Sequence, residues 1–148
     1  MFMKIFFILL VLERISPWKT SLERGQNDVS LLRDLINMIR DAGEYFRSNL
    51  TSASLRRIVR LEQQFFRIVA SGNLSEAALS SVSKQALPVF ESVDLFLRQA
   101  SSKDRSLRRF RRKVSANLLK ARVLANRGFL AYSAFEVSFQ ALKARQAE

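Results

Sequence analysis

Apolar residues recur at alternating steps of three and four positions along most of this chain, and this spacing constrains its fold more than any other feature. The clearest run occupies positions Leu79, Val82, Ala86, Val89, Val93, Phe96 and Ala100. Such steps place apolar side chains on one side of an α-helix, whereas a half-buried strand needs a step of two. The pattern predicts an all-α protein whose helices pack into an antiparallel bundle.

Residues that begin and end helices divide this pattern into four segments. The first predicted helix runs from residue 27 or 28 to about residue 48. The second has Thr51 or Ser52 as its N-cap and ends near Gly72, because a hydroxyl side chain caps a helix start and glycine commonly follows a helix end.

The third predicted helix begins at Asn73. Its side chain can cap the helix while Glu76, three residues later, reaches back to the first turn. Pro88 lies inside this segment, and proline lacks a backbone donor and disfavours helix at the preceding residue. We therefore expect a kink or a break there.

The fourth segment, from about residue 102 to residue 147, is predicted to be one long C-terminal helix. More than 40 residues would form a rod of about 65 Å, whereas the other helices span about 30–42 Å. We expect a bend near Gly128 or a protruding end.

The fold predicted for residues 28–148 is an up-and-down four-helix bundle. Its expected core contains Leu32, Leu35, Ile39, Phe46, Ile58, Phe65, Val69, Leu79, Val82, Val93, Phe96, Leu118, Phe135 and Phe139.

An apolar segment occupies the amino terminus, where residues 1–12 read MFMKIFFILLVL. A basic start followed by a short apolar run is typical of a secretory signal, and the run is too short to span a membrane. No small-x-small cleavage site follows, so a retained helix on the bundle or in a membrane interface remains an alternative. A mitochondrial presequence fits less well. Polar residues, Pro17, Gly25 and Asn27 predict a linker over residues 13–27, which separates this segment from the bundle.

The chain contains no cysteine and no histidine. This excludes disulfides, thiolate metal sites, thiol catalysis and the Ser–His–Asp triad, and it removes the usual general base. The composition therefore favours a non-enzymatic binding protein, and no metal or cofactor is predicted.

Positive charge is concentrated in one stretch. The net charge is +12, and the stretch from Arg105 to Phe135 holds nine basic residues and no acidic one. Its densest part predicts an anion-binding helix face formed by Arg105, Arg108, Arg109, Arg111, Arg112 and Lys113. The second helix adds Arg56, Arg57, Arg60 and Arg67 on its polar face, with the first three as the predicted site residues, and the two faces would be continuous if these helices were neighbours.

Glu62 falls in the middle of the apolar face of the second helix. A carboxylate in a core is costly unless it is paired or protonated. The favoured interpretation is that Glu62 meets an Arg of another helix or escapes at the end of the bundle. The alternative is a functional acid or a buried ion pair that sets specificity.

These features predict a basic helical protein that enters the secretory or membrane route. Its Arg-rich face would bind an anionic membrane surface or an acidic protein partner. A cytoplasmic bundle that binds nucleic acid is the alternative, because Arg side chains also bind phosphates. An enzyme built on Glu62 is a third possibility, and it would require a cavity with Arg or Tyr partners.

Overall fold

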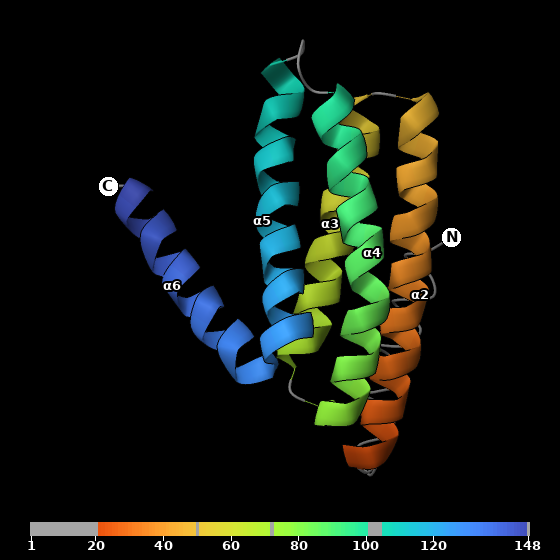
Figure 1. The fold of residues 1–148 in the computed structure, drawn as a ribbon, viewed down its shortest axis with the longest axis vertical. Helices are drawn as coiled ribbons and strands as arrows, with labels where there is room; N and C mark the ends of the chain where they lie inside the picture. The colour runs from red at the N-terminus through yellow and green to blue at the C-terminus, as the bar shows by residue number, and fades with distance from the viewer. Residues whose placement is uncertain (1–20, 50, 72, 101–104, 148) are drawn as a thin grey trace, which may run out of the picture.

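The computed structural model describes residues 21–49, 51–71, 73–100 and 105–147. These residues form five helices: α2 (Ser21–Ser48), α3 (Ser52–Ala70), α4 (Glu76–Ala100), α5 (Arg105–Arg127) and α6 (Phe129–Ala147). Helices α2 to α5 lie side by side and alternate in direction, while α6 leaves one end of α5 and runs back at an angle (Figure 1). The described part contains no strand, so the predicted all-α class is confirmed.

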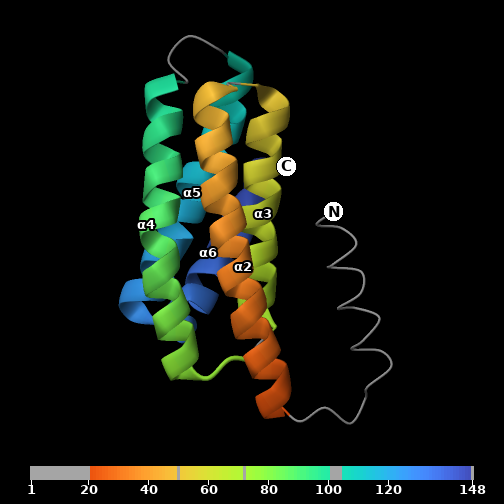
Figure 2. The ribbon, with the colours of Figure 1, turned by 90° about the vertical axis from the view of Figure 1, so that its right-hand side faces the viewer.

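The helices are arranged in two layers. Helix α2 packs against α3 and α4, and α5 packs against α3, α4 and α6. Helices α2 to α5 thus surround one core in the order α2, α3, α5, α4, and we group them as two layers, α2 with α4 and α3 with α5. Seen from the side in Figure 2, α5 and α6 lie behind α2 and α4.

The core lies between these layers. Eleven of the fourteen predicted core residues are buried, including Leu32, Phe46 and Val82. The rings of Phe65 and Phe90 meet edge to face at 5.3 Å near the centre of the core. This geometry is the one that aromatic pairs prefer.

Three predicted core residues are only partly buried: Phe96, Phe135 and Phe139. Phe96 lies at the edge of the core, where the guanidinium carbon of Arg47 is 4.4 Å from the ring centre. Phe135 and Phe139 belong to α6 and stack on each other with 6.1 Å between ring centres. They are outside the core because α6 does not continue along the bundle.

The first helix begins earlier than predicted, at Ser21. Gly25 and Asn27 lie inside α2, so the predicted linker is wrong for residues 21–27. A single glycine inside a helix costs only about 1 kcal/mol, which the packing of a 28-residue helix outweighs. The predicted apolar segment 1–12 and the linker residues 13–20 lie outside the described residues.

The cap of the second helix is confirmed, whereas the cap of the third is not. The side chain of Thr51 accepts a hydrogen bond of 3.2 Å from the backbone N–H of Ser54. At the start of α4, Ser75 performs this role, because its hydroxyl accepts from the backbone N–H of Ala78 at 3.2 Å. The predicted capping box of Asn73 and Glu76 is therefore wrong, because the residue that caps α4 is Ser75, two positions after Asn73.

Proline and glycine act differently on the last two predicted helices. Helix α4 passes through Pro88 without a break. The long C-terminal helix, by contrast, is divided at Gly128, whose φ of +88° is a conformation that glycine adopts readily. The predicted count of four helices is not confirmed, because residues 105–147 form two helices with different directions.

Candidate anion-binding surface

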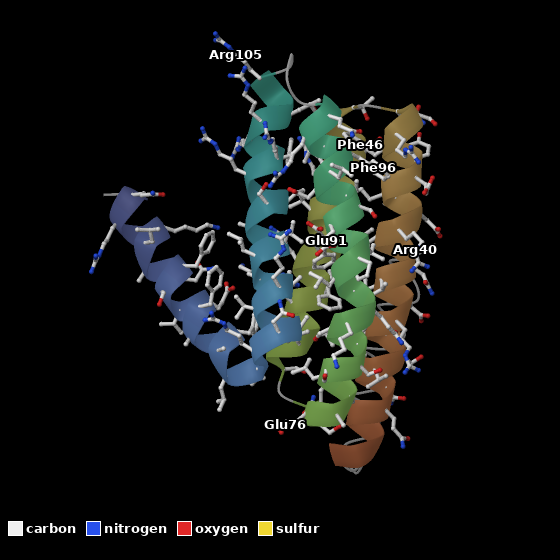
Figure 3. All side chains as sticks on the ribbon, viewed as in Figure 1. Arg40, Phe46, Glu76, Glu91, Phe96 and Arg105 are labelled. Carbon is white, nitrogen blue, oxygen red and sulfur yellow. The ribbon has the colours of Figure 1, made fainter. Side chains whose placement is uncertain are left out.

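The predicted Arg-rich face lies on the outer side of α5. Arg105, Arg108, Arg109, Arg112 and Lys113 are exposed, and Arg111 is partly buried. Leu107, Val114 and Leu118 on the opposite side are buried, so core packing fixes which way α5 is turned. Figure 3 shows Arg105 pointing away from the bundle at the end of α5. None of these six basic residues takes part in a salt bridge with another described residue.

Helix α3 extends this basic face. It packs beside α5, and Arg56, Arg57 and Arg60 on it are exposed. The guanidinium carbon of Arg56 lies 6.0 Å from the centre of the Phe110 ring of α5. The two predicted Arg clusters are therefore on neighbouring helices.

Charge is segregated between the two layers. Helix α3 holds four Arg and α5 holds nine basic residues, and the only acidic residue in either helix is the buried Glu62. Helices α2 and α4 together hold six basic and eight acidic residues. We call α3 and α5 the cationic layer, because acidic side chains from these helices nowhere interrupt its surface.

A groove separates α6 from the cationic layer. It has a volume of about 710 Å³ and is lined by side chains of α3, α5 and α6. Its basic lining residues are Arg67, Arg109, Arg112, Lys113, Lys120 and Lys143, and its aromatic ones are Phe66, Tyr132 and Phe139. Among the residues that the structure describes, the only acidic one in this lining is Glu136. We call this space the α6 groove.

Helix α6 is attached across this groove by an aromatic pair and an ion pair. The ring of Tyr132 stacks on Phe66 of α3 with 5.7 Å between centres. The Nζ of Lys120 in α5 lies 2.8 Å and 3.1 Å from the two carboxylate oxygens of Glu136. Gln140 also donates to Glu136, at 2.8 Å. These contacts hold α6 against the cationic layer near Gly128.

The ionisation of the attaching groups follows from their surroundings. Burial alone would raise the pKa of Glu136, but hydrogen bonds from Lys120 and Gln140 and the charges of Lys120 and Lys143 lower it overall. Burial, aided by the charge of Glu136, raises the pKa of Tyr132 to about 12. At neutral pH the described lining of the groove therefore contains one carboxylate, which is already paired, and a neutral Tyr132.

Glu62 is fully buried, and it neither meets an Arg nor escapes at the end of the bundle, so the favoured interpretation is wrong. The side-chain amide of Asn117 donates to one carboxyl oxygen at 3.1 Å, and the other oxygen has no hydrogen-bond partner among the described residues. The pKa of Glu62 is raised to about 8, chiefly by burial, against the lowering effect of the Asn117 hydrogen bond and with a smaller contribution from the charge of Asp94. Glu62 does not line the α6 groove, although Asn117 does.

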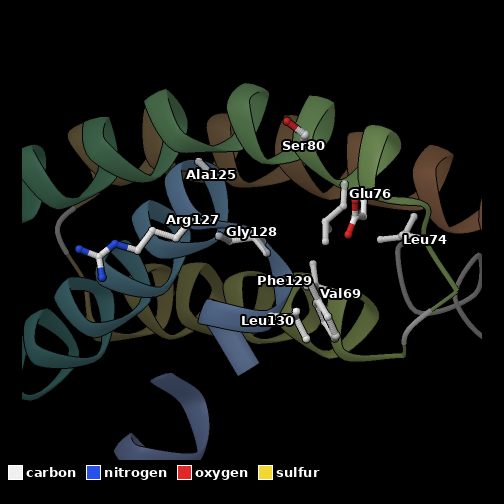
Figure 4. Close-up of a pocket in the computed structure, with 11 residues that line it drawn as sticks. Val69, Leu74, Glu76, Ser80, Ala125, Arg127, Gly128, Phe129 and Leu130 are labelled. Carbon is white, nitrogen blue, oxygen red and sulfur yellow. The ribbon is translucent and has the colours of Figure 1, made fainter. Parts of the chain in front are cut away.

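A second cavity, of about 500 Å³, lies at the turn between α5 and α6. Its walls are largely apolar and include Val69, Leu74 and Phe129 (Figure 4). Glu76 and Arg127 lie at opposite ends of this lining (Figure 4). The cavity therefore lacks the convergent positive charge of the α6 groove.

The sequence pattern did not indicate two of the basic groove residues, Lys120 and Lys143, as site residues, although it placed Arg67 on the basic face of the second helix. Arg67 and Lys143 are 76 positions apart, and they line the same groove only because α6 turns back at Gly128. The one signal in the sequence was Gly128 within an otherwise helical pattern. It indicated a bend but not the direction of α6.

Within residues 21–49, 51–71, 73–100 and 105–147, we find no cluster of His, Cys, Asp or Glu suited to a metal ion. No helix of this part is long and apolar enough to cross a bilayer. Comparisons with protein-family models, curated proteins and solved structures find no match to the chain.

Proposed function

We propose that this chain is a non-enzymatic protein that binds peripherally to an anionic membrane surface through the cationic layer and α6. The observation that carries the proposal is the segregation of charge, with thirteen basic residues and no exposed acidic residue in α3 and α5. Each Lys or Arg near an anionic leaflet contributes about 1 kcal/mol of attraction. Several side chains on one face would therefore give substantial affinity.

Exposed apolar residues on α6 favour a membrane over an acidic protein partner. Leu130 and Val137 are 83% and 69% exposed. With the exposed Ala134 and Ala141, they follow the steps of four, three and four that place residues on one side of a helix. The opposite side of α6 carries Tyr132 and faces the cationic layer, so the apolar side points away from the bundle beyond that layer.

A surface that combines basic residues with protruding apolar ones matches the two interactions of an interfacial protein. Electrostatic attraction brings the protein to anionic headgroups, and apolar side chains then enter the boundary between headgroups and acyl chains. A purely acidic protein or a nucleic acid would satisfy the basic residues but would leave Leu130 and Val137 in water.

Sedimentation with vesicles tests the proposal. We expect binding to vesicles that contain phosphatidylserine and little binding to phosphatidylcholine vesicles. Arg108→Glu with Arg109→Glu and Arg112→Glu should abolish it. The matched control reverses the same amount of charge in the other layer, with Arg33→Glu, Arg40→Glu and Lys84→Glu, and should retain most of the binding.

Equal loss in the two triple variants would show that total charge, and not the cationic layer, determines binding. Tighter binding to polyglutamate or to duplex DNA than to anionic vesicles would support an acidic protein or a nucleic acid as the partner. Leu130→Ser with Val137→Ser tests the apolar contribution separately. It should weaken vesicle binding at least tenfold, because fully burying even one such side chain is worth about 1.5–3 kcal/mol and about 1.4 kcal/mol is a factor of ten.

The segment of residues 1–12 supports a route to the membrane. We propose that it directs the chain into the secretory or membrane pathway, as a cleaved signal or as a retained apolar helix. The intact mass of the natural protein distinguishes these forms. A mature chain that keeps Met1 and is free in the cytoplasm would refute this route.

The alternating directions of α2 to α5 support a finer description of the fold. We infer that these four helices are an up-and-down bundle that is stable without α6, since the attachment of α6 is concentrated near Gly128. Hydrogen exchange should then be faster in residues 129–147 than in the buried parts of α3 and α4. Equal protection of all five helices would contradict this division.

A further inference from the structure

The α6 groove gathers positive charge from three helices into one concave space. Arg67 comes from α3, Arg109, Arg112 and Lys113 come from α5, and Lys143 comes from α6. Salt bridges between described residues involve none of these five. Glu136, the single acidic residue of the lining within the described part of the chain, is held by Lys120 and Gln140.

The described residues of the groove do not neutralise the positive charge of these five side chains. Like charges that share a concave space repel one another, and a bound anion would remove that repulsion. Three of the five cations are Arg, whose planar guanidinium group presents donors in a fork that matches phosphate oxygens. Gln63, Gln140 and Gln146 also line the groove, and their amide groups can donate to such oxygens.

The volume of the groove indicates the size of the ligand. Pockets for small molecules and cofactors usually measure about 300–1,000 Å³, and the groove has about 710 Å³. A single phosphate would fill a small part of this space and could reach only some of the five cations. A compact group that carries several phosphates would reach cations on all three helices.

We propose that the α6 groove is a binding site for a small organic headgroup that bears two or more phosphate monoesters. The group would be supplied by a membrane lipid or by a soluble molecule. The proposal deepens the proposed function, on which it rests for the lipid source alone. In this proposal, Arg67, Lys143 and the basic groove residues of α5 make the site bind clusters of phosphate groups more tightly than singly charged lipids.

Calorimetric titration with inositol 1,4,5-trisphosphate tests the site directly. We expect saturable binding that Arg67→Gln with Lys143→Gln weakens about tenfold or more, because a hydrogen bond between charged groups is worth that much. The matched control is Arg33→Gln with Lys84→Gln. It removes the same charge from α2 and α4, outside both the groove and the cationic layer, and its affinity should change less than about twofold. All four side chains are exposed, and thermal unfolding verifies that each variant is folded.

A gain of affinity provides a second readout. Glu136→Gln removes the one carboxylate among the described lining residues of the groove but keeps an amide oxygen that can accept a hydrogen bond from Lys120, so α6 should stay attached and inositol trisphosphate should bind more tightly. Equal effects of the groove pair and the control pair, weaker binding to Glu136→Gln, or the absence of binding to inositol trisphosphate would overturn the proposal.

Vesicles separate this proposal from the proposed function and identify the source of the headgroup. At equal total charge, vesicles with phosphatidylinositol bisphosphate should bind more tightly than phosphatidylserine vesicles. Arg67→Gln with Lys143→Gln should remove this preference but should keep the binding to phosphatidylserine vesicles. Binding to phosphatidylserine vesicles without binding to inositol trisphosphate would refute the groove alone. Binding to inositol trisphosphate without any vesicle binding would refute the membrane function and would assign the groove to a soluble ligand.

Discussion

At the scale of single residues, Glu62 is the most unusual group of the core. An ionised carboxylate without a cationic partner is costly inside a protein, so the group holds its proton instead. Asn117 satisfies one oxygen only. Because Asn117 also lines the α6 groove, the buried acid and the candidate site share one side chain.

The raised pKa of Glu62 predicts how stability depends on pH. The native state keeps a proton up to about pH 8, whereas the unfolded state releases it near pH 4.5. The stabilisation from this protonated group is therefore complete below about pH 4.5 and is lost as the pH rises to about 8 and above. Between these values, the free energy of unfolding should fall by up to about 1.4 kcal/mol per pH unit.

Urea unfolding between pH 5 and pH 9 measures this effect. Glu62→Gln keeps the shape of the neutral acid and cannot ionise, so its free energy of unfolding should decline much less over this range. Parallel curves for the two proteins would contradict a protonated Glu62 in the native state.

The sequence predicted the burial of Glu62 but not its partner. The helical period alone places residue 62 on the apolar face of its helix. Asn117 is 55 positions away, and only the mutual rotation of α3 and α5 brings the two together. An Arg partner was a reasonable expectation in a chain with 18 Arg, yet packing turns the basic side chains of α3 and α5 outward.

At the scale of helices, Gly128 determines where the last segment goes. The backbone N–H of Gly128 still bonds to the carbonyl of Leu124 at 3.2 Å, and the carbonyl of Gly128 accepts from Tyr132 at 3.1 Å. One residue therefore closes α5 and opens α6. A straight helix of the predicted length would have carried Tyr132 and Glu136 away from α3.

Substitution of Gly128 should destabilise the protein through the backbone. A Cβ at this position would meet no atom within 4 Å, so the cost arises from the φ of +88° and not from a collision. We expect Gly128→Ala to lower the free energy of unfolding by about 1–3 kcal/mol. Gly128→Asn should lower it less, because Asn tolerates positive φ better than Ala does. Urea unfolding gives this order, and a Gly128→Ala variant as stable as the unsubstituted protein would contradict it.

The helices themselves were largely predictable, and their ends were less so. Apolar periodicity located all four segments because it reflects burial, which is the dominant favourable term in folding. Caps depend on which of several nearby polar residues reaches the first turn, and Ser75 was indistinguishable from Asn73 by type alone. Pro88 did not break α4, since packing of the helix on both sides of it outweighs one missing hydrogen bond.

At the scale of the whole molecule, crowded positive charge should weaken the folded state. The net charge is +12, and α5 contains nine basic residues and no acidic one, of which Lys120 and Arg122 pair with Glu136 and Glu91 of neighbouring helices. Salt screens repulsion between exposed charges with a length of about 8 Å at physiological ionic strength. We therefore expect sodium chloride to raise the midpoint of thermal unfolding by a few degrees between 20 mM and 300 mM.

A neutralised variant provides the control for this effect. Arg108→Gln, Arg109→Gln and Arg112→Gln together should raise the midpoint at low salt and reduce its response to salt. A midpoint that falls as salt is added would indicate that attractive ion pairs, and not repulsion, dominate the electrostatic energy of the fold.

The candidate site shows which features of a protein cannot be predicted from the pattern of residues along its sequence. The charge of the Arg105–Lys113 stretch was visible in the sequence, and so was the polar face of α3. To predict that these residues form one surface, one must know which helices are neighbours in the bundle. To predict the α6 groove, one must also know that the chain reverses direction at Gly128. Neither property follows from periodicity, which specifies the face of each helix but not its neighbours.

The two-layer separation of charge also gives the molecule an electric dipole moment directed across the bundle, from the mixed α2 and α4 side toward the cationic layer. Such a dipole experiences a torque in the field of a distant anionic surface. A molecule that approaches at random would be rotated before contact, so that the cationic layer arrives first. Orientation during the encounter, and hence the rate of association, is set by this asymmetry before any residue of the α6 groove has touched a ligand.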